Sequence, residues 1–146
     1  MEVASLNENL FTAIAIVLAI VVFAIGFRAF TQALRRWAFG KNEDVKKSWK
    51  DVEQLLKRGD AMSLRLAVIH ADAVLDLALK HKGFPGDIMS RRMQFGQRRF
   101  SGLRKVGWAH GLRNRLVHEP MTAASSGEAK RAIRAFEHAL KEMGAL

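Results

Sequence analysis

The sequence contains no cysteine, so disulfide bonds and thiolate metal sites are excluded. It has no glycine-rich phosphate loop, and its histidines show no spacing typical of a metal site. We therefore predict no cofactor and no metal. Acidic residues are scarce: 14 Asp and Glu stand against 24 Lys and Arg, which gives a net charge of +10. This balance indicates an anionic partner, either a nucleic acid or phospholipid headgroups.

Charge is entirely missing from residues 10–27, "LFTAIAIVLAIVVFAIGF". Twelve of these eighteen residues are Leu, Ile, Val or Phe, and their summed insertion free energy is about −4 to −7 kcal/mol at a bilayer centre. As a helix the run is about 27 Å long, close to the thickness of the hydrocarbon layer. A buried core helix is the alternative, but such helices are usually shorter and have a polar face. The run predicts one membrane-spanning helix.

The charges on either side of this run predict its orientation. The first nine residues include Glu2 and Glu8 and no basic residue, which does not fit a cleaved signal peptide. Basic residues follow the run, so the positive-inside rule places the amino terminus outside the plasma membrane and the rest of the chain in the cytoplasm. Arg28, Arg35 and Arg36 are then placed to contact anionic headgroups. The expected organisation is an extracytoplasmic tail (1–9), a transmembrane and juxtamembrane helix (10–40) and a cytoplasmic domain (41–146).

The cytoplasmic part shows no sustained period-two alternation, so the predicted fold class is all-α. Gly59 marks the end of one helix, and Asp60 is placed to cap the next. Ser125 and Glu128 have the spacing of a capping box at the start of the last helix. The pattern predicts a bundle of four main helices plus a short one. In order, these are a helix through 45–56, a central buried helix (61–81), a short basic helix (88–95), a long helix (98–118) and a final helix (125–143).

One arginine of the long helix falls on its apolar side. On a helical wheel of residues 98–118, Arg113 lies within the apolar arc. Because an unpaired buried charge is costly, Arg113 must have a partner or face another protein surface. Asp72 and Asp76, one turn apart on the central helix, are the predicted partners in the first case. Asn114 lies next to Arg113, and His118 lies at the helix end, where free carbonyls favour a protonated imidazole.

Two interpretations of Arg113, Asn114 and His118 remain open. In the structural one, Arg113 bonds to Asp72 or Asp76 and His118 only interacts with the helix end. The Arg-x4-His spacing has little weight alone, because Arg65 and His70 repeat it. In the functional one, the histidine takes a proton from a ribose 2′-hydroxyl and the arginine stabilises the phosphorane-like transition state. That set would cleave RNA without a metal, and DNA lacks the attacking hydroxyl.

The end of the long helix resembles the HEPN superfamily (higher eukaryotes and prokaryotes nucleotide-binding). The resemblance begins with "RNRLVHE", in which a polar residue directly follows the arginine. A wider pattern, "SLRLAVIHADAVLDLAL", "GLRKVGWAHGLRNRLVHEP" and "AIRAFEHAL", is similar to a bacterial group of small HEPN-like proteins and covers about residues 45–143. Members of that group have an acidic residue at the position of His70, so the chain departs from the pattern on its central helix.

The resemblance implies a homodimer in which two Arg-x4–6-His motifs meet and form a metal-independent endoribonuclease site. Arg113, Asn114 and His118 match that motif. It would also account for an arginine on an apolar arc, since the arc could form part of the interface. Some family members do not cleave RNA. The alternative is therefore a non-catalytic, membrane-tethered module for dimerisation or for binding RNA or nucleotides.

Residues 88–118 contain no acidic residue. Phe95, Phe100 and Trp108 are interleaved with basic side chains there, a pattern that could follow an RNA backbone. The alternatives are a solvated helix face whose aromatic residues Phe100 and Trp108 belong to the core, or a surface for anionic lipid. The predicted nucleic-acid-binding residues are Arg91, Arg92, Arg98, Arg99, Arg104, Lys105 and Arg115.

Overall fold

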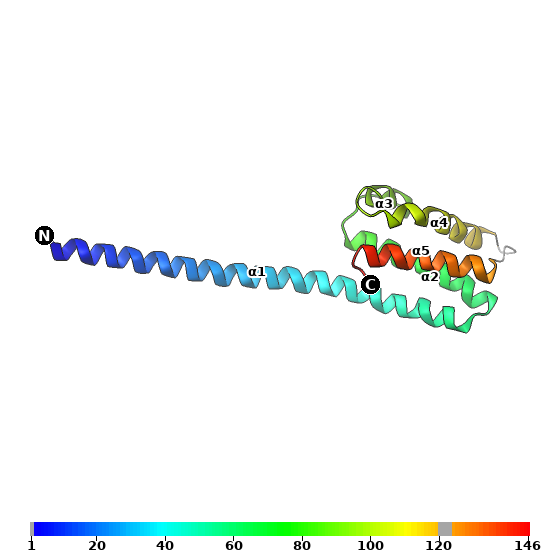
Figure 1. Cartoon of the computed structure of the whole chain (residues 1–146), viewed down its shortest axis with the longest axis horizontal. Coiled ribbons are helices and arrows are strands. Elements are labelled where there is room, and N and C mark those ends of the chain that lie inside the picture. Colours follow the sequence, from blue (N-terminus) through cyan, green and yellow to red (C-terminus); the bar gives the residue numbers. More distant parts are fainter. Residues whose placement is uncertain (1, 120–123) are drawn as a thin grey trace. The chain divides into compact units, whose positions relative to one another are not determined.

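The structure, a computed structural model, describes the backbone of residues 2–119 and 124–146 and the side chains of residues 18–31, 42–119 and 124–146. All regular secondary structure in these ranges is helical, which confirms the predicted all-α class. The chain divides after Phe39 into two units, and helix α1 contributes to both. The helices are α1 (Glu2–Arg58), α2 (Ala61–His81), α3 (Met89–Gly96), α4 (Gly102–His118) and α5 (Ser126–Glu142), as Figure 1 shows.

In the first unit, the described part of α1 exposes its apolar side chains. All residues from Leu18 to Phe30 are exposed, and the rings of Phe23 and Phe27 stack with centroids 6.3 Å apart. Within the described side chains, we find no helix with an apolar stretch long enough to cross a membrane. The predicted span lies only partly in this range, because the side chains of residues 10–17 are outside it, as are residues 1–9, Arg35 and Arg36. The membrane-spanning helix stays a prediction.

The helix ends in the second unit follow the local signals of the sequence. Gly59 has a φ of +73° and ends α1, a conformation that glycine adopts without strain. The Asp60 side chain accepts a hydrogen bond of 2.9 Å from the backbone N–H of Ser63 and caps α2. Ser125 and Glu128 form the reciprocal capping box of α5. These predicted caps are therefore confirmed.

The predicted start of the fourth helix at residue 98 is wrong, because α4 begins at Gly102. The backbone N–H groups of Arg99 and Phe100 both donate to the Gly96 carbonyl at 2.9 Å, which closes a turn after α3. The Phe100 ring then packs edge-to-face on Phe84, with centroids 6.2 Å apart. Burial of Phe100 against a distant loop therefore overrides the helical pattern of residues 98–101.

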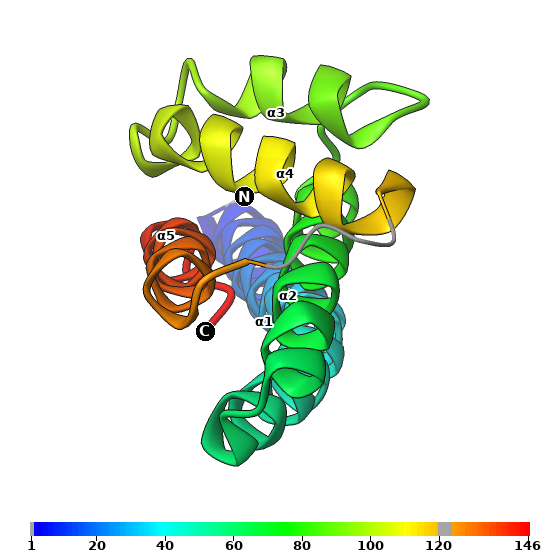
Figure 2. The same cartoon turned by 90° about the vertical axis from the view of Figure 1, so that its right-hand side faces the viewer.

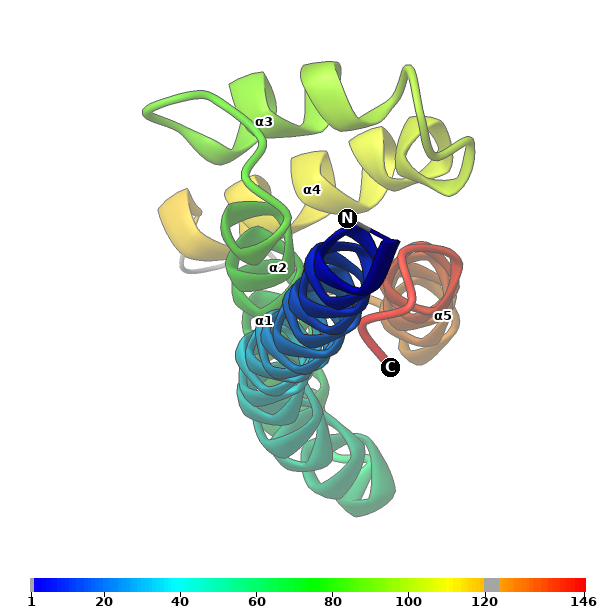
Figure 3. The ribbon, with the colours of Figure 1, turned by 90° about the vertical axis from the view of Figure 1, so that its left-hand side faces the viewer.

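Helix α2 is the centre of the core, as predicted. It contacts α3, α4 and α5, and Figure 2 shows α4 crossing α2 with α5 beside it. Leu75 and Leu79 of α2 are fully buried, as is Phe136 of α5. The apolar stripe of the last helix, which recurs at three or four residues in the sequence, is buried throughout: Ala129, Ile133, Phe136, Leu140 and Met143. After α5 the chain turns back at Gly144, and the N–H of Ala145 donates to Leu140 O at 2.9 Å (Figure 3).

The start of α4 is capped by a side chain from the end of α5. Glu142 accepts hydrogen bonds from the backbone N–H groups of Gly102 at 2.6 Å and Ser101 at 2.9 Å. These bonds, the one from Gly102 first, lower the pKa of Glu142. A Cβ at residue 102 would lie 2.5 Å from Glu142 Oε2 and 3.3 Å from the Cα of Ala139, so glycine allows α4 to begin against α5.

We expect Glu142→Gln to lower the melting temperature at neutral pH, because the ionised carboxylate is the form that the two N–H groups stabilise. A lowered pKa in the folded state gives stability that is present above the ordinary glutamate value of about 4.5 and is lost as the pH falls below it. The difference in melting temperature between variant and parent should therefore be larger at pH 7 than at pH 3. An equal difference at both pH values would contradict a role for the charge.

Candidate functional site

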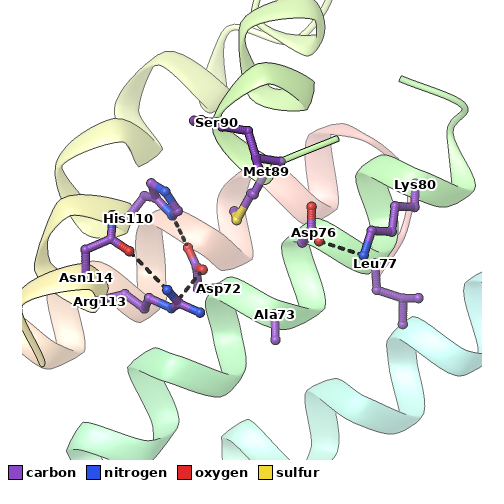
Figure 4. A pocket seen from close by; sticks show the side chains of 11 residues that line it. Asp72, Ala73, Asp76, Leu77, Lys80, Met89, Ser90, His110, Arg113 and Asn114 are labelled. Carbon is purple, nitrogen blue, oxygen red and sulfur yellow. Dashed lines mark hydrogen bonds and ion pairs between the residues drawn. The ribbon is translucent and has the colours of Figure 1, made fainter. Parts of the chain in front are cut away.

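A pocket of about 670 Å³ opens between α2, α3 and α4 (Figure 4). It brings together four residues that the sequence singled out, Asp72, Asp76, Arg113 and Asn114. The acidic residues come from successive turns of α2, and the other two come from α4. The remaining lining residues are Ala73, Leu77, Lys80, Ile88, Met89, Ser90 and His110.

The buried carboxylate of Asp72 joins two α4 side chains. Only 3% of the Asp72 side chain is exposed. His110 Nδ1 lies 2.7 Å from Asp72 Oδ1, and Arg113 Nε lies 3.3 Å from Asp72 Oδ2. Nε makes no hydrogen bond among the described residues, so this second contact is an ion pair without a directed bond. Because a carboxylate only accepts hydrogen bonds, His110 Nδ1 is the donor in this contact.

Arg113 also has a side turned toward solvent. Its Nη1 donates to Asn114 Oδ1 at 3.0 Å, and 31% of the side chain is exposed. The Nε edge is thus held by Asp72, and the guanidinium lines the pocket beside Asn114. An arginine kept beside a buried carboxylate by an ion pair can offer its other donors to a phosphate.

The structure pairs each predicted carboxylate with a different arginine. Asp72 is the partner of Arg113, as one of the two sequence alternatives proposed. Asp76 instead accepts from Arg92 Nε at 2.8 Å and Nη2 at 3.0 Å, and it forms an ion pair with Lys80 at 2.9 Å. Arg92 is 6% exposed. Its guanidinium joins α3 to α2, and its assignment to nucleic-acid binding stays a prediction.

The other proposed nucleic-acid-binding residues lie on the surface. Exposed side chains are found at Arg91, Arg98, Arg99, Arg104, Lys105 and Arg115. Arg91 lies 3.6 Å from the carboxylate of Asp87. The placement of Trp108 in the core is wrong, because 39% of this residue is exposed. Phe100 is partly buried against the core, as the core alternative predicted.

Within a single chain, His118 lies outside the pocket. His118 is exposed at the last residue of α4 and is not among the lining residues, whereas Arg113 and Asn114 are. His110 is the pocket histidine that sequence reasoning missed. The signal was present, because residues three and four apart lie on one face of a helix, and His110 precedes Arg113 and Asn114 by these intervals.

Comparisons with protein-family models, with curated proteins and with solved structures found no match to this chain. The HEPN resemblance therefore rests on the residues that carry it.

Proposed function

We propose that this chain is a membrane-anchored, HEPN-like endoribonuclease that acts as a homodimer and needs no metal. Arg113 stabilises the scissile phosphate, Asn114 positions it, and His118 transfers the proton. The observation that carries the proposal is the state of Arg113, held at Nε by buried Asp72 while its guanidinium lines an open pocket beside Asn114. His118, exposed at the end of the same helix, is free to approach a substrate shared with a second subunit.

The reaction is a transesterification within the RNA. The ribose 2′-oxygen attacks the adjacent phosphorus while a histidine removes its proton, and the bond from phosphorus to the 5′-oxygen breaks. The products are a 2′,3′-cyclic phosphate and a 5′-hydroxyl that receives a proton from a protonated histidine. Arg113 is suited to the negative charge that develops on the non-bridging oxygens. DNA is not a substrate for this reaction because it lacks the 2′-hydroxyl.

A membrane anchor is part of the proposal. The described part of the apolar run, residues 18–27, exposes Leu, Ile, Val and Phe side chains, and a single helix in water has nothing to cover them. The uncharged run as a whole has the length of a bilayer core. Basic residues after it favour a cytoplasmic location for the helical domain.

The outer face of α4 is a candidate for the contact between subunits. On a helical wheel, Gly107, Gly111 and His118 fall within about 40° of one another. A Cβ at Gly107 or Gly111 would meet no atom within 4 Å in the described part of the chain, so no side chain described there fills this space. Glycines four residues apart let two helices approach closely. A second α4 packed here would bring the two His118 side chains to one region.

We expect the Gly107→Ala/Gly111→Ala chain to be a more stable protomer and a weaker dimer. Alanine is favoured over glycine in an exposed helix by about 0.5–1 kcal/mol per residue, while two added methyl groups would separate the packed helices. Chemical unfolding and sedimentation of the full chain in detergent measure the two effects. Gly127→Ala on α5 is the matched control for a helical glycine. Unchanged dimerisation beside the gain in stability would place the dimer contact elsewhere.

A non-catalytic module is the second candidate, and one observation favours it: Arg113 already has an acidic partner within its own protomer. The deciding experiment uses the full chain in phosphatidylcholine nanodiscs with EDTA and a labelled single-stranded RNA. The same oligonucleotide with deoxyribose throughout is the control. Cleavage of the RNA alone, leaving cyclic phosphate ends, supports the nuclease. A dimer that binds RNA and leaves it intact supports the module.

A further inference from the structure

A second hollow lies on the other flank of α4, where it packs against α5. Its volume is about 420 Å³, and it is lined by Lys105, Trp108, Arg131, Ala135 and His138. It shares no lining residue with the pocket around Asp72. Trp108 is the main planar surface in this hollow.

The indole of Trp108 is held in place and is still accessible. The Arg131 guanidinium lies over the Trp108 ring, 4.4 Å from the ring centroid. This cation–π contact from α5 restricts the indole, so ordering it on binding costs less than for a free side chain. At the same time 39% of the residue is exposed, although neighbouring α4 residues such as Ala109 and Leu112 are buried. An aromatic ring and a guanidinium plane are the two surfaces on which proteins stack unpaired bases.

The charges around the hollow favour an anion. Lys105 and Arg131 line it, and α4 has no acidic residue at all. Glu128 interacts electrostatically with Arg131, and Glu142 with His138, but both carboxylates are also hydrogen-bonded at the start of a helix. Glu128 bonds to Ser125 at the start of α5, and Glu142 bonds to the N–H groups at the start of α4. Arg104, Arg115 and Arg134 add exposed positive charge on the same two helices.

We propose that this hollow binds single-stranded RNA, with one base stacked on the Trp108–Arg131 pair and the flanking phosphates beside Lys105 and Arg131. The choice of RNA over another anion rests on the proposed function. A recessed aromatic ring with cations at its rim fits a splayed base, whereas a flat lipid surface contacts protruding groups. The site would hold the strand on one flank of α4 while the pocket around Arg113 acts on the other.

The test separates stacking from charge. The full chain in phosphatidylcholine nanodiscs is titrated with a labelled 2′-O-methyl oligonucleotide, which cannot be cleaved, and with the same strand carrying abasic residues. The parent chain should prefer the base-bearing strand, and Trp108→Ala should lower its affinity for that strand about tenfold while leaving the abasic strand unchanged. Trp108→Phe should keep most of the preference. Arg131→Ala should weaken the binding of both strands and reduce the salt dependence of that binding.

Several results would overturn the inference. Val117→Ala removes another exposed apolar α4 side chain, 40% exposed and outside the hollow, and is the matched control. Stacking is contradicted if Val117→Ala and Trp108→Ala lose the same affinity for the base-bearing strand. It is also contradicted if Trp108→Ala keeps the parent's ratio of base-bearing to abasic affinity. A further test adds phosphatidylserine to the nanodisc. If this lipid displaces RNA from the parent but not from Trp108→Ala, the hollow binds lipid instead of RNA.

The proposed nuclease can fail independently. A Trp108-dependent preference for bases without any cleavage of ordinary RNA overturns the nuclease alone. Cleavage that persists in Trp108→Ala with the parent's preference for bases overturns the stacking site alone. A chain that binds neither strand contradicts both.

Discussion

Substitution of His118 by alanine is expected to slow RNA cleavage by a factor of about 100 or more, because a positioned general acid–base group contributes roughly 10²–10⁴ to a rate. Single-turnover cleavage of a labelled RNA in EDTA measures the effect. His118 is exposed and the last residue of α4, so its loss should leave the fold unchanged. His70→Ala, an exposed histidine on α2, is the matched control. An active His118→Ala chain beside an inactive His110→Ala chain would assign the proton transfer to the pocket histidine.

A second prediction concerns whether Arg113 and His118 of one site come from the same subunit or from different subunits. Arg113→Ala should also be slowed by a factor of about 100 or more, since loss of one transition-state donor costs this much. If arginine and histidine come from different subunits, a mixture of inactive Arg113→Ala and His118→Ala chains forms heterodimers with one intact site. With random exchange, half of the dimers have one of two sites intact, so about a quarter of the parent activity returns. No recovery despite exchange would mean that each subunit holds its own pair.

A structural role for the arginine would give a different result. Arg113→Ala removes one partner of the buried Asp72, so circular dichroism must show that the variant is folded before its rate is interpreted. Arg58→Ala, an exposed arginine at the end of α1, is the matched control for the loss of one positive charge. An unfolded Arg113→Ala chain together with a fully inactive parent would support the non-catalytic module.

The helical fold could be predicted because its signals are local. Gly59 ends α1 through its own backbone conformation, and Asp60 and Ser125 begin helices through bonds to residues three positions later. The stripe of α5 was recognisable for the same reason, since one helix has a single apolar face. The start of α4 was missed because it depends on the contact of Phe100 with Phe84 and on Glu142, which lies 40 residues from Gly102.

The candidate site could be predicted only in part. The wheel showed that Arg113 needs a partner, and α2 offered two carboxylates with nearly the same position on its surface. Which one it contacts depends on how α4 crosses α2, and on α3, which brings Arg92 to Asp76. The alternative that placed Trp108 in the core was wrong because an apolar arc on a wheel does not show where the core ends. The Arg131 guanidinium that lies over the Trp108 ring belongs to α5, which a wheel of one helix does not include.

Substitutions of the two α2 carboxylates are expected to differ in effect: Asp76→Ala should mainly lower stability, and Asp72→Ala should mainly lower activity. Asp76→Ala leaves Arg92, whose side chain is 7% exposed, without its acidic partner. Breaking a buried ion pair at one end costs roughly 3–5 kcal/mol. We therefore expect the free energy of unfolding of the full chain in detergent, measured with urea, to fall by about this amount. Arg92→Met should cost less, because Asp76 keeps Lys80 as a partner and is 18% exposed.

Asp72→Ala should cost less stability and more activity than Asp76→Ala. Its partners Arg113 and His110 have side chains that are 31% and 18% exposed, so both reach water when the carboxylate is lost. The expected loss is about 1–2 kcal/mol, below that of a fully buried pair. Cleavage should nevertheless fall by a factor of about 100, because Arg113 loses the ion pair that keeps its guanidinium beside the pocket. Asp72→Asn keeps the shape of the side chain and removes its charge, so its cleavage rate should lie between those of the parent and Asp72→Ala. If Asp72→Ala cleaves RNA at the parent rate while Asp76→Ala unfolds, the ion pair with Arg113 is dispensable and the pocket around Asp72 is not where cleavage occurs.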